Sequence, residues 1–259
     1  MVRGTVFLMY HELEVPGRAL CQRSRGYMRY VVPKSAFIAQ MKWLIESGWR
    51  GLTVTEALDK PDTNSVAITF DDGCETDSLG AAPVLLEIGF RATFYATAGW
   101  IGRPGYLGPA QLRELHASGF EVGCHSMTHA YLDDLDENDL QREIVDSKKK
   151  LEDILGAEVR HFSCPGGRFD RRAIQAARRT GYRSLATSYP HENSCKSDRF
   201  RLGRVAVLRG MAEGTFGRIC RGNLWQMRGS DALRTAAKWA LGNDLYEHVR
   251  STILGRPDL

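Results

Sequence analysis

One short segment guides the interpretation of the chain: residues 66–73, VAITFDDG. Its apolar, β-branched first part predicts a buried strand over residues 66–70. Asp71 and Asp72 follow directly. Adjacent carboxylates beside a buried strand repel each other and resist burial, unless one simply caps the next helix. A metal ion resolves the conflict, because one carboxylate can bind the cation while the other stays ionised beside it as a general base.

Similar apolar runs recur along the chain and predict further strands. We expect strands at residues 5–10, 51–54, 66–70, 92–96, 120–124, 160–164, 184–187 and 204–208. Helices are predicted between them, among them 35–47, one opened by Pro109, and 136–155, and glycine followed by an aromatic residue marks several returns to a strand. This alternation predicts an α/β protein with a parallel sheet, either a barrel or a doubly wound sheet. No GxGxxG follows the first strand, so a dinucleotide site is not indicated.

Composition narrows the class of protein. The 259 residues are 43% hydrophobic and 25% charged, which is typical of a soluble globular protein. The net charge of +4 is too small to indicate a partner nucleic acid. No run approaches the roughly 18 apolar residues of a membrane span. The first apolar run, 5–10, is short for a signal peptide, so we expect a cytoplasmic protein, with peripheral membrane association left open.

The cysteines do not form a recognisable metal-binding or redox motif. There are six: Cys21, Cys74, Cys124, Cys164, Cys195 and Cys220. None belongs to a CxxC pair, so neither a zinc ribbon nor a dithiol redox motif is indicated. Reduced thiols in a cytosolic protein are the simplest expectation. The oligomeric state is not indicated by any pattern in the chain.

Polar residues gather where the predicted strands end. His11 and Glu12 follow the first strand, Asp71 and Asp72 the third, His125 to His129 the fifth, and Pro165, Gly166 and Gly167 the sixth. The carboxyl ends of parallel strands meet at one edge, where active sites of α/β folds are built. The sequence therefore predicts one site made of these segments.

The residue types at this edge suit a catalytic metal. His125 and His129 are four residues apart, so one helical turn would place both on the same face. Two histidines and a carboxylate leave positions open for water and substrate, and they suit Zn²⁺, with Co²⁺, Ni²⁺ or Fe²⁺ as alternatives. Pro165, Gly166 and Gly167 form either an ordinary turn or a backbone N–H site that polarises a carbonyl oxygen.

Two of these motifs together resemble a known family. Residues 69–73, TFDDG, followed by His125-Ser126 and His129, look like the polysaccharide deacetylases, the NodB-like carbohydrate esterases of family four. The resemblance covers about residues 4–210. It implies a distorted (β/α) barrel of about seven parallel strands over 1–210. Residues 211–259 would be a C-terminal helical extension packed on the barrel, with helical spacing after Gly229.

The resemblance also implies an activity: metal-dependent hydrolysis that removes N-acetyl groups from an amino sugar in an oligosaccharide, polysaccharide or precursor. Asp71 matches the catalytic base, and Asp72, His125 and His129 match the metal ligands. Asp71 would take the proton of the attacking water, and the oxyanion would be held by the metal and a backbone N–H.

This chain departs from the family in two places. Many members carry an arginine at the position of Ser163, where it steadies the base, and Arg204 or Arg91 could replace it here. A histidine near the end that acts as general acid is absent, since residues 207–209 read Val-Leu-Arg. His11, His191 or a metal-bound water could serve instead.

Two other functions stay open. The same site could act on a non-sugar amide, or the chain could bind a sugar with reduced catalysis. The intact Asp71 argues against a pure binding protein, because such a protein needs no base beside a metal ligand. In each sugar-directed case the expected partner is a carbohydrate.

Overall fold

The computed structural model describes residues 4–60, 64–225 and 227. Within them the main sheet has eight strands, and every strand pairing is parallel. The strand order is β10-β1-β5-β6-β7-β8-β9. The remaining strand, β4, pairs with the first half of β5, and β6 pairs with the second half. Their bounds are β1 Val6–Tyr10, β4 Arg50–Leu52, β5 Ser65–Phe70, β6 Thr93–Ala96, β7 Glu121–Cys124, β8 His161–Ser163, β9 Ser184–Ala186 and β10 Val205–Ala206.

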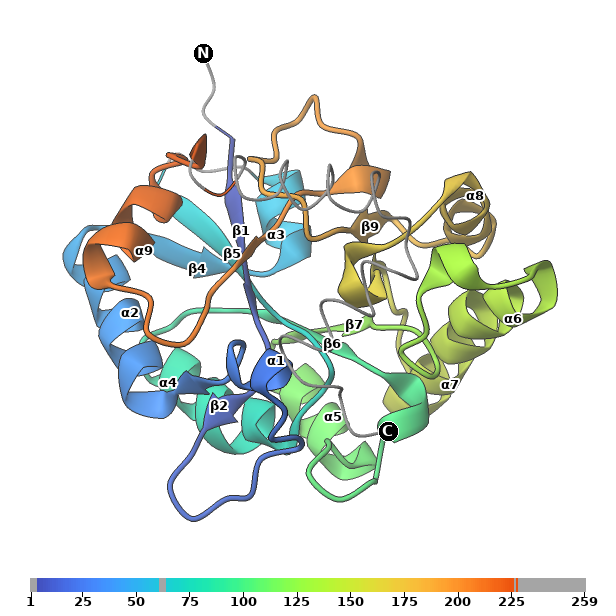
Figure 1. Cartoon of the computed structure of the whole chain (residues 1–259), viewed down its shortest axis with the longest axis horizontal. Helices are drawn as coiled ribbons and strands as arrows, with labels where there is room; N and C mark the ends of the chain where they lie inside the picture. Colours follow the sequence, from blue (N-terminus) through green and yellow to red (C-terminus); the bar gives the residue numbers. More distant parts are fainter. Residues whose placement is uncertain (1–3, 61–63, 226, 228–259) are drawn as a thin grey trace.

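The sheet curls into a distorted barrel. An isolated parallel bridge between Ala186 and Leu202 links the end of β9 to the segment that enters β10, so the two ends of the sheet approach each other. Helices cover the outside of the sheet (Figure 1). A small second sheet, β2 Leu13–Glu14 with β3 Val32–Pro33, and the short helix α1 Arg25–Met28 lie between β1 and the first long helix.

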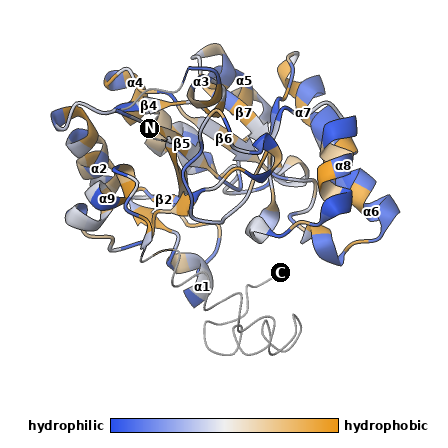
Figure 2. Ribbon diagram, turned by 90° about the horizontal axis from the view of Figure 1, so that it is seen from above, coloured by the Kyte–Doolittle hydropathy of each residue, from blue (hydrophilic) through white to orange (hydrophobic). Residues whose placement is uncertain are grey.

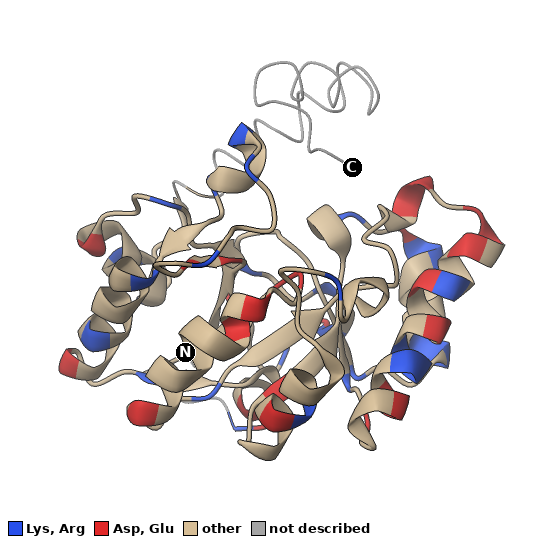
Figure 3. Cartoon of the chain, turned by 90° about the horizontal axis from the view of Figure 1, so that it is seen from below, with Lys and Arg blue, Asp and Glu red and all other residues tan. Residues whose placement is uncertain are grey.

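The outer layer consists of helices with one apolar side. Figure 2 shows the hydrophilic colour concentrated on the outer helices α6, α7 and α8, and Figure 3 shows charges of both signs on the same helices. The helices are α2 Lys34–Glu46, α3 Val54–Asp59, α4 Ala82–Glu87, α5 Pro109–Ala117, α6 Glu137–Gln141, α7 Ser147–Leu155, α8 Arg171–Arg179 and α9 Glu213–Cys220, with short 3₁₀ or π turns η1 Asp77–Ala81, η2 Ala98–Trp100, η3 Leu132–Asp134, η4 Arg142–Asp146, η5 Pro165–Gly167 and η6 Arg199–Arg201. No helix of the described residues is long and apolar enough to cross a membrane.

Most predicted elements are present within a residue or two. The eight predicted strands correspond to the eight strands of the main sheet, and Pro109 opens α5. The helix predicted over 136–155 is present, with Asp136 as its N-cap, and the π turn η4 joins α6 to α7 without a break in the helical backbone angles. There the Ser147 hydroxyl donates to the Glu143 carbonyl (2.5 Å), which competes with the regular helical pattern.

The C-terminal extension is described only in part. Helix α9 packs against α2, and the Phe216 ring meets Trp43 edge-on at 5.8 Å between centroids. The helix expected after Gly229 lies outside the described residues, so the division at residue 210 stays a prediction.

A polar network closes the barrel at the amino ends of its strands. Thr93, Glu121, His161 and Ser184 are the first residues of β6, β7, β8 and β9. The Glu121 carboxylate accepts from Thr93 (2.6 Å), lies 3.3 Å from His161 Nε2 and also accepts from Thr55. His161 Nδ1 lies 2.8 Å from the Ser184 hydroxyl. The opposite, carboxyl end of the barrel is therefore the end left for a functional site.

This network predicts an acid-sensitive stability. Burial raises the pKa of Glu121, but His161 and the hydrogen bonds outweigh it and lower that pKa from 4.5 to about 2. A carboxyl with a depressed folded-state pKa stabilises the fold above its unfolded value and loses this contribution as the pH falls towards the folded value. In urea unfolding at stepped pH, we expect Glu121→Gln to be less stable than the wild type by about 2–3 kcal/mol near neutrality.

The stability gap should close as the pH falls from about 5 to about 2. Glu46→Gln on the exposed face of α2 is the matched control and should show a small gap at every pH. A gap for Glu121→Gln that stays constant over this range would contradict the assignment.

Candidate active site

The two carboxylates leave β5 in a tight turn. The Asp71 N–H donates to the Tyr10 carbonyl at 3.0 Å, which continues the ladder with β1. Asp72 then adopts φ +78°, and Gly73 adopts φ +77° beside the backbone of Ala96. A left-handed conformation is costly for a residue with a Cβ. The turn therefore sends the side chains of two neighbouring residues into different surroundings.

Asp71 is held by a fully buried arginine. Arg204 Nη1 and Nη2 donate to the two carboxylate oxygens at 2.6 and 2.7 Å. The same guanidinium donates to Thr187 O (2.9 Å), Thr69 Oγ1 (3.3 Å) and Ser163 Oγ (2.7 Å). These five hydrogen bonds match the five donors of a guanidinium group. Arg204 is thus fixed in one orientation, and so is the carboxylate it binds.

This ion pair keeps Asp71 ionised. Burial alone raises the pKa of Asp71, but the Arg204 charge, then that of His125, and the Arg204 hydrogen bonds outweigh burial and lower it. A carboxylate that is ionised, buried and oriented is what a general base requires. Its Oδ2 lies 3.9 Å from His125 Nε2 and so faces the histidines.

Asp72 converges with both histidines. Its Oδ1 lies 3.5 Å from His125 Nε2 and 3.4 Å from His129 Nε2. Ligand atoms bound to one tetrahedral Zn²⁺ at about 2.0–2.1 Å stand about 3.4 Å apart. Among the described residues, this buried oxygen has no hydrogen-bond partner. The three side chains therefore form a group that could hold a divalent cation, and the role of Asp72, His125 and His129 as metal ligands stays a prediction.

The histidines are prepared as ligands by their surroundings. His125 Nδ1 lies 2.9 Å from the Ser163 carbonyl, which can only accept, so the proton is on Nδ1 and the Nε2 lone pair faces Asp72. Burial lowers the pKa of His125 to about 4, which favours the neutral ring that a metal needs. Burial also opposes charge on His129, but the adjacent Asp72 carboxylate outweighs burial and raises the pKa of His129.

The expected helical turn from His125 to His129 is not present. Ser126 and His129 adopt φ +66° and +67°, and the segment is irregular. Glu143 determines this shape: its Oε2 accepts from the N–H groups of Met127 and Thr128, both at 2.8 Å, and its Oε1 accepts from the Thr128 hydroxyl at 2.6 Å. A buried carboxylate therefore replaces the helical hydrogen bonds and still brings the two rings together.

The glycine turn after β8 lies at the same edge. Pro165 has no N–H, and the Gly167 N–H donates to the Cys164 carbonyl at 2.9 Å. Of the three predicted residues, Gly166 is left as the candidate N–H donor. It adopts φ +60°, and a Cβ there would lie 2.7 Å from the Tyr131 ring.

The structure distinguishes among the residues that the sequence offered as supports for the catalytic base or as the general acid. Arg204 rather than Arg91 holds the base, since Arg91 donates to the Phe90 carbonyl and lies over Phe120. His11 lies near the site, because the charges of Asp72 and Asp71 act on it, although burial dominates and lowers its pKa. Its buried Nδ1 has no hydrogen-bond partner among the described residues.

His191, the other histidine considered as an acid, packs against Gly203, one residue before Arg204.

Sequence reasoning missed two residues at this site. Glu143 lies on η4, far along the chain from the turn that it shapes, and no local pattern marks it. Trp100 stacks on the ring of His129 at 5.2 Å between centroids. Its place just after β6, at the edge where the other motifs gather, was the available signal.

Known proteins are similar to this chain. The sequence profile described as Polysaccharide deacetylase matches residues 59–185, which contain both carboxylates, both histidines and the glycine turn. A Bacillus subtilis (strain 168) protein named as a candidate polysaccharide deacetylase, YxkH, is 34% identical over 216 residues, or 81% of this chain and 74% of that protein. A Bacillus cereus peptidoglycan-N-acetylglucosamine deacetylase is 31% identical over 125 residues, or 48% of this chain and 56% of that protein.

A solved structure confirms the fold. The Streptococcus pyogenes deacetylase PplD in complex with acetate superposes with a TM-score of 0.74 at 23% identity, covering 85% of this chain and 99% of that one. At this identity the likeness concerns the fold alone, and it agrees with the predicted distorted (β/α) barrel. Together with the profile match and the 34% identity to YxkH, it leads to one conclusion. The chain belongs to the polysaccharide deacetylase family, whose members have the NodB-like barrel.

Proposed function

We propose that this protein is a metal-dependent hydrolase that removes N-acetyl groups from an amino sugar within an oligosaccharide, a polysaccharide or their precursor. One observation carries the proposal: Arg204 holds Asp71 on one side, while Asp72, His125 and His129 converge on the other. The two neighbouring carboxylates thus serve separately as base and ligand. The similarity to a peptidoglycan-N-acetylglucosamine deacetylase supports an N-acetylated sugar as the substrate.

Each residue then has a defined task. A divalent cation held by Asp72, His125 and His129 would polarise the scissile carbonyl and make a water acidic enough to attack it. Asp71 accepts the proton of that water at Oδ2, the oxygen that faces the histidines. The Gly166 N–H is the donor available to the oxyanion as negative charge develops on the former carbonyl oxygen.

The departing amine must gain a proton. His11 lies near both carboxylates and has a buried Nδ1 without a partner among the described residues. We therefore favour His11 over His191 as the group that delivers this proton.

Acetate release tests the proposal. The panel should contain N-acetylated chito-oligosaccharides, peptidoglycan fragments, precursor sugars and a simple non-sugar acetamide. We expect release from at least one sugar, loss of release with a chelator, and recovery on addition of Zn²⁺ or Co²⁺. Release from the non-sugar amide alone would favour the alternative amidohydrolase, and no release with any metal would refute a hydrolase.

Two variants separate the base from the metal ligands. Asp71→Asn should lose turnover by at least about 10³-fold while metal content is unchanged, because only the proton acceptor is removed. His125→Ala should lose the metal ion held by Asp72, His125 and His129, as elemental analysis would measure. Asp153→Asn, at an exposed position of α7, is the matched control. Loss of metal from Asp71→Asn would show that Asp71 is itself a ligand.

Arg204 should set the acid limb of the pH–rate profile. Arg204→Lys keeps the charge but loses the two-pronged bond to Asp71, so the pKa of Asp71 should rise. The base is active when ionised, so the acid limb should move to higher pH and kcat should fall by about 10-fold or more. Arg204→Ala leaves a buried carboxylate unpaired and should cost about 3–5 kcal/mol in urea unfolding.

The exposed Arg201→Lys serves as the control for Arg204→Lys. An unchanged acid limb in Arg204→Lys, with catalysis otherwise intact, would mean that Asp71 is not the titrating base.

A further inference from the structure

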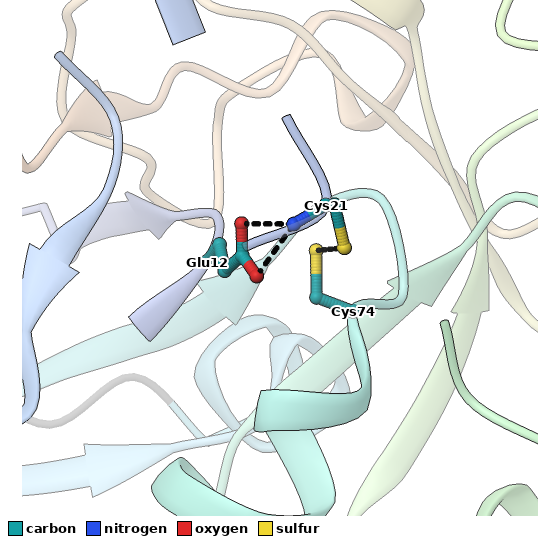
Figure 4. Close-up of side chains that lie close together, drawn as sticks. All are labelled: Glu12, Cys21 and Cys74. Carbon is teal, nitrogen blue, oxygen red and sulfur yellow. Dashed lines mark hydrogen bonds between the residues drawn. The ribbon is translucent and has the colours of Figure 1, made fainter. Parts of the chain in front are cut away.

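A second group of potential ligands lies beside the first. Cys21 comes from the segment between β2 and α1, Cys74 follows the Asp71–Gly73 turn, and Glu12 follows β1 (Figure 4). The two sulfurs are 3.6 Å apart, and the two Sγ atoms and a Glu12 oxygen all lie within 4.8 Å of one another. Glu12 and Cys74 are buried, and Cys21 is half-buried. None of these side chains belongs to the Asp72–His125–His129 group.

We propose that Cys21, Cys74 and Glu12 form a second metal site, selective for a thiophilic divalent cation such as Zn²⁺. Two thiolates bound to one tetrahedral Zn²⁺ at about 2.3 Å stand about 3.8 Å apart, which the observed 3.6 Å matches. A carboxylate is a regular third ligand of zinc beside sulfur. Binding releases the two thiol protons to solvent and forms two Zn–S bonds, so no oxidant or reductant takes part.

The surrounding hydrogen bonds already orient the ligands. The Cys21 N–H donates to both Glu12 oxygens at 3.1 Å. The Tyr27 hydroxyl donates to Glu12 Oε2 at 2.8 Å and lies 3.5 Å from Cys74 Sγ. Such outer partners fix a carboxylate ligand and are typical of built metal sites.

A disulfide explains these positions less well. It would need the sulfurs at about 2.05 Å, whereas they lie 3.6 Å apart here and both thiols are free. It would also leave a buried carboxyl group without a charge partner. Asp77 is fully buried in η1, its N–H donates to the Cys74 carbonyl, and neither of its carboxylate oxygens has a partner among the described residues. Burial, followed by the charge of Asp72, raises the pKa of Asp77, and a cation beside Cys74 would favour the ionised form of this carboxyl.

The second site would stabilise the fold and would not take part in the hydrolysis. It would tie the segment between β2 and α1 to the end of β5, directly behind the turn that aims Asp71 and Asp72. Cation binding to the folded state stabilises it by RT ln(1 + L/Kd), where L is the free cation concentration, so the stabilisation grows with the logarithm of that concentration. We therefore expect the metal to raise the melting temperature through Cys21 and Cys74 even when the histidine site is disabled.

Metal counting tests this inference without an activity assay. Full-length protein purified with Zn²⁺ should hold about two zinc ions per chain, and Cys21→Ser and Cys74→Ser should each hold about one. His125→Ala should lose the other ion and keep the thiolate-bound one. Cys195→Ser, which removes an exposed thiol, is the matched control and should keep both ions. Zinc content that is the same in Cys21→Ser, Cys74→Ser and the wild type would overturn the proposal.

Cobalt gives a second readout on the wild type in case a variant fails to fold. Co²⁺ added to metal-free protein should produce the intense sulfur-to-cobalt charge-transfer absorption, and bound Zn²⁺ should protect two thiols from alkylation until a chelator is added. Absence of both signals would overturn the proposal. So would an unreduced chain whose mass shows the loss of two hydrogens at Cys21 and Cys74, since this identifies a disulfide. Failure of acetate release would not bear on either result.

Discussion

The buried ion pair between Asp71 and Arg204 is the constraint on which the rest of the site depends. An isolated carboxylate at this depth would protonate and lose its use as a base. Arg204 prevents this with a guanidinium whose five donors are all directed at acceptors inside the barrel. Those acceptors come from β5 and its end, from β8 and from the segment after β9. The same hydrogen bonds therefore link these segments of the barrel and orient the base.

This pair also explains how two adjacent carboxylates differ in role. Both oxygens of Asp71 accept hydrogen bonds from Arg204, whereas Asp72 Oδ1 follows a left-handed turn, lies near two histidines and has no hydrogen-bond partner in the described part of the chain. Ser163 joins the two halves, because its hydroxyl accepts from Arg204 and its carbonyl accepts from His125. The position where many relatives carry an arginine is thus filled by a small residue, and the positive charge comes instead from Arg204, directly before the last strand.

Local sequence patterns predicted the structural features that depend on residues close together in the chain. The run 66–73 predicted β5 and its terminal carboxylates, and the other apolar runs predicted the remaining strands of the sheet. Local patterns did not predict the structural features that depend on side chains distant in the sequence. The turn at 125–129 is shaped by Glu143, which lies in a π turn within the helix over 136–155. The contact between Cys21 and Cys74 joins residues far apart in the chain, so a search for CxxC spacing could not find it.

A crystal structure of the zinc-loaded protein, with the metal located by anomalous scattering, tests the central claim most directly. That claim is the division of labour between Asp71 and Asp72. It predicts a zinc peak within bonding distance of Asp72 Oδ1 and of Nε2 of both His125 and His129, with Asp71 still bound to Arg204 through both oxygens. A zinc peak bound by Asp71, or Asp71 released from Arg204, would contradict it.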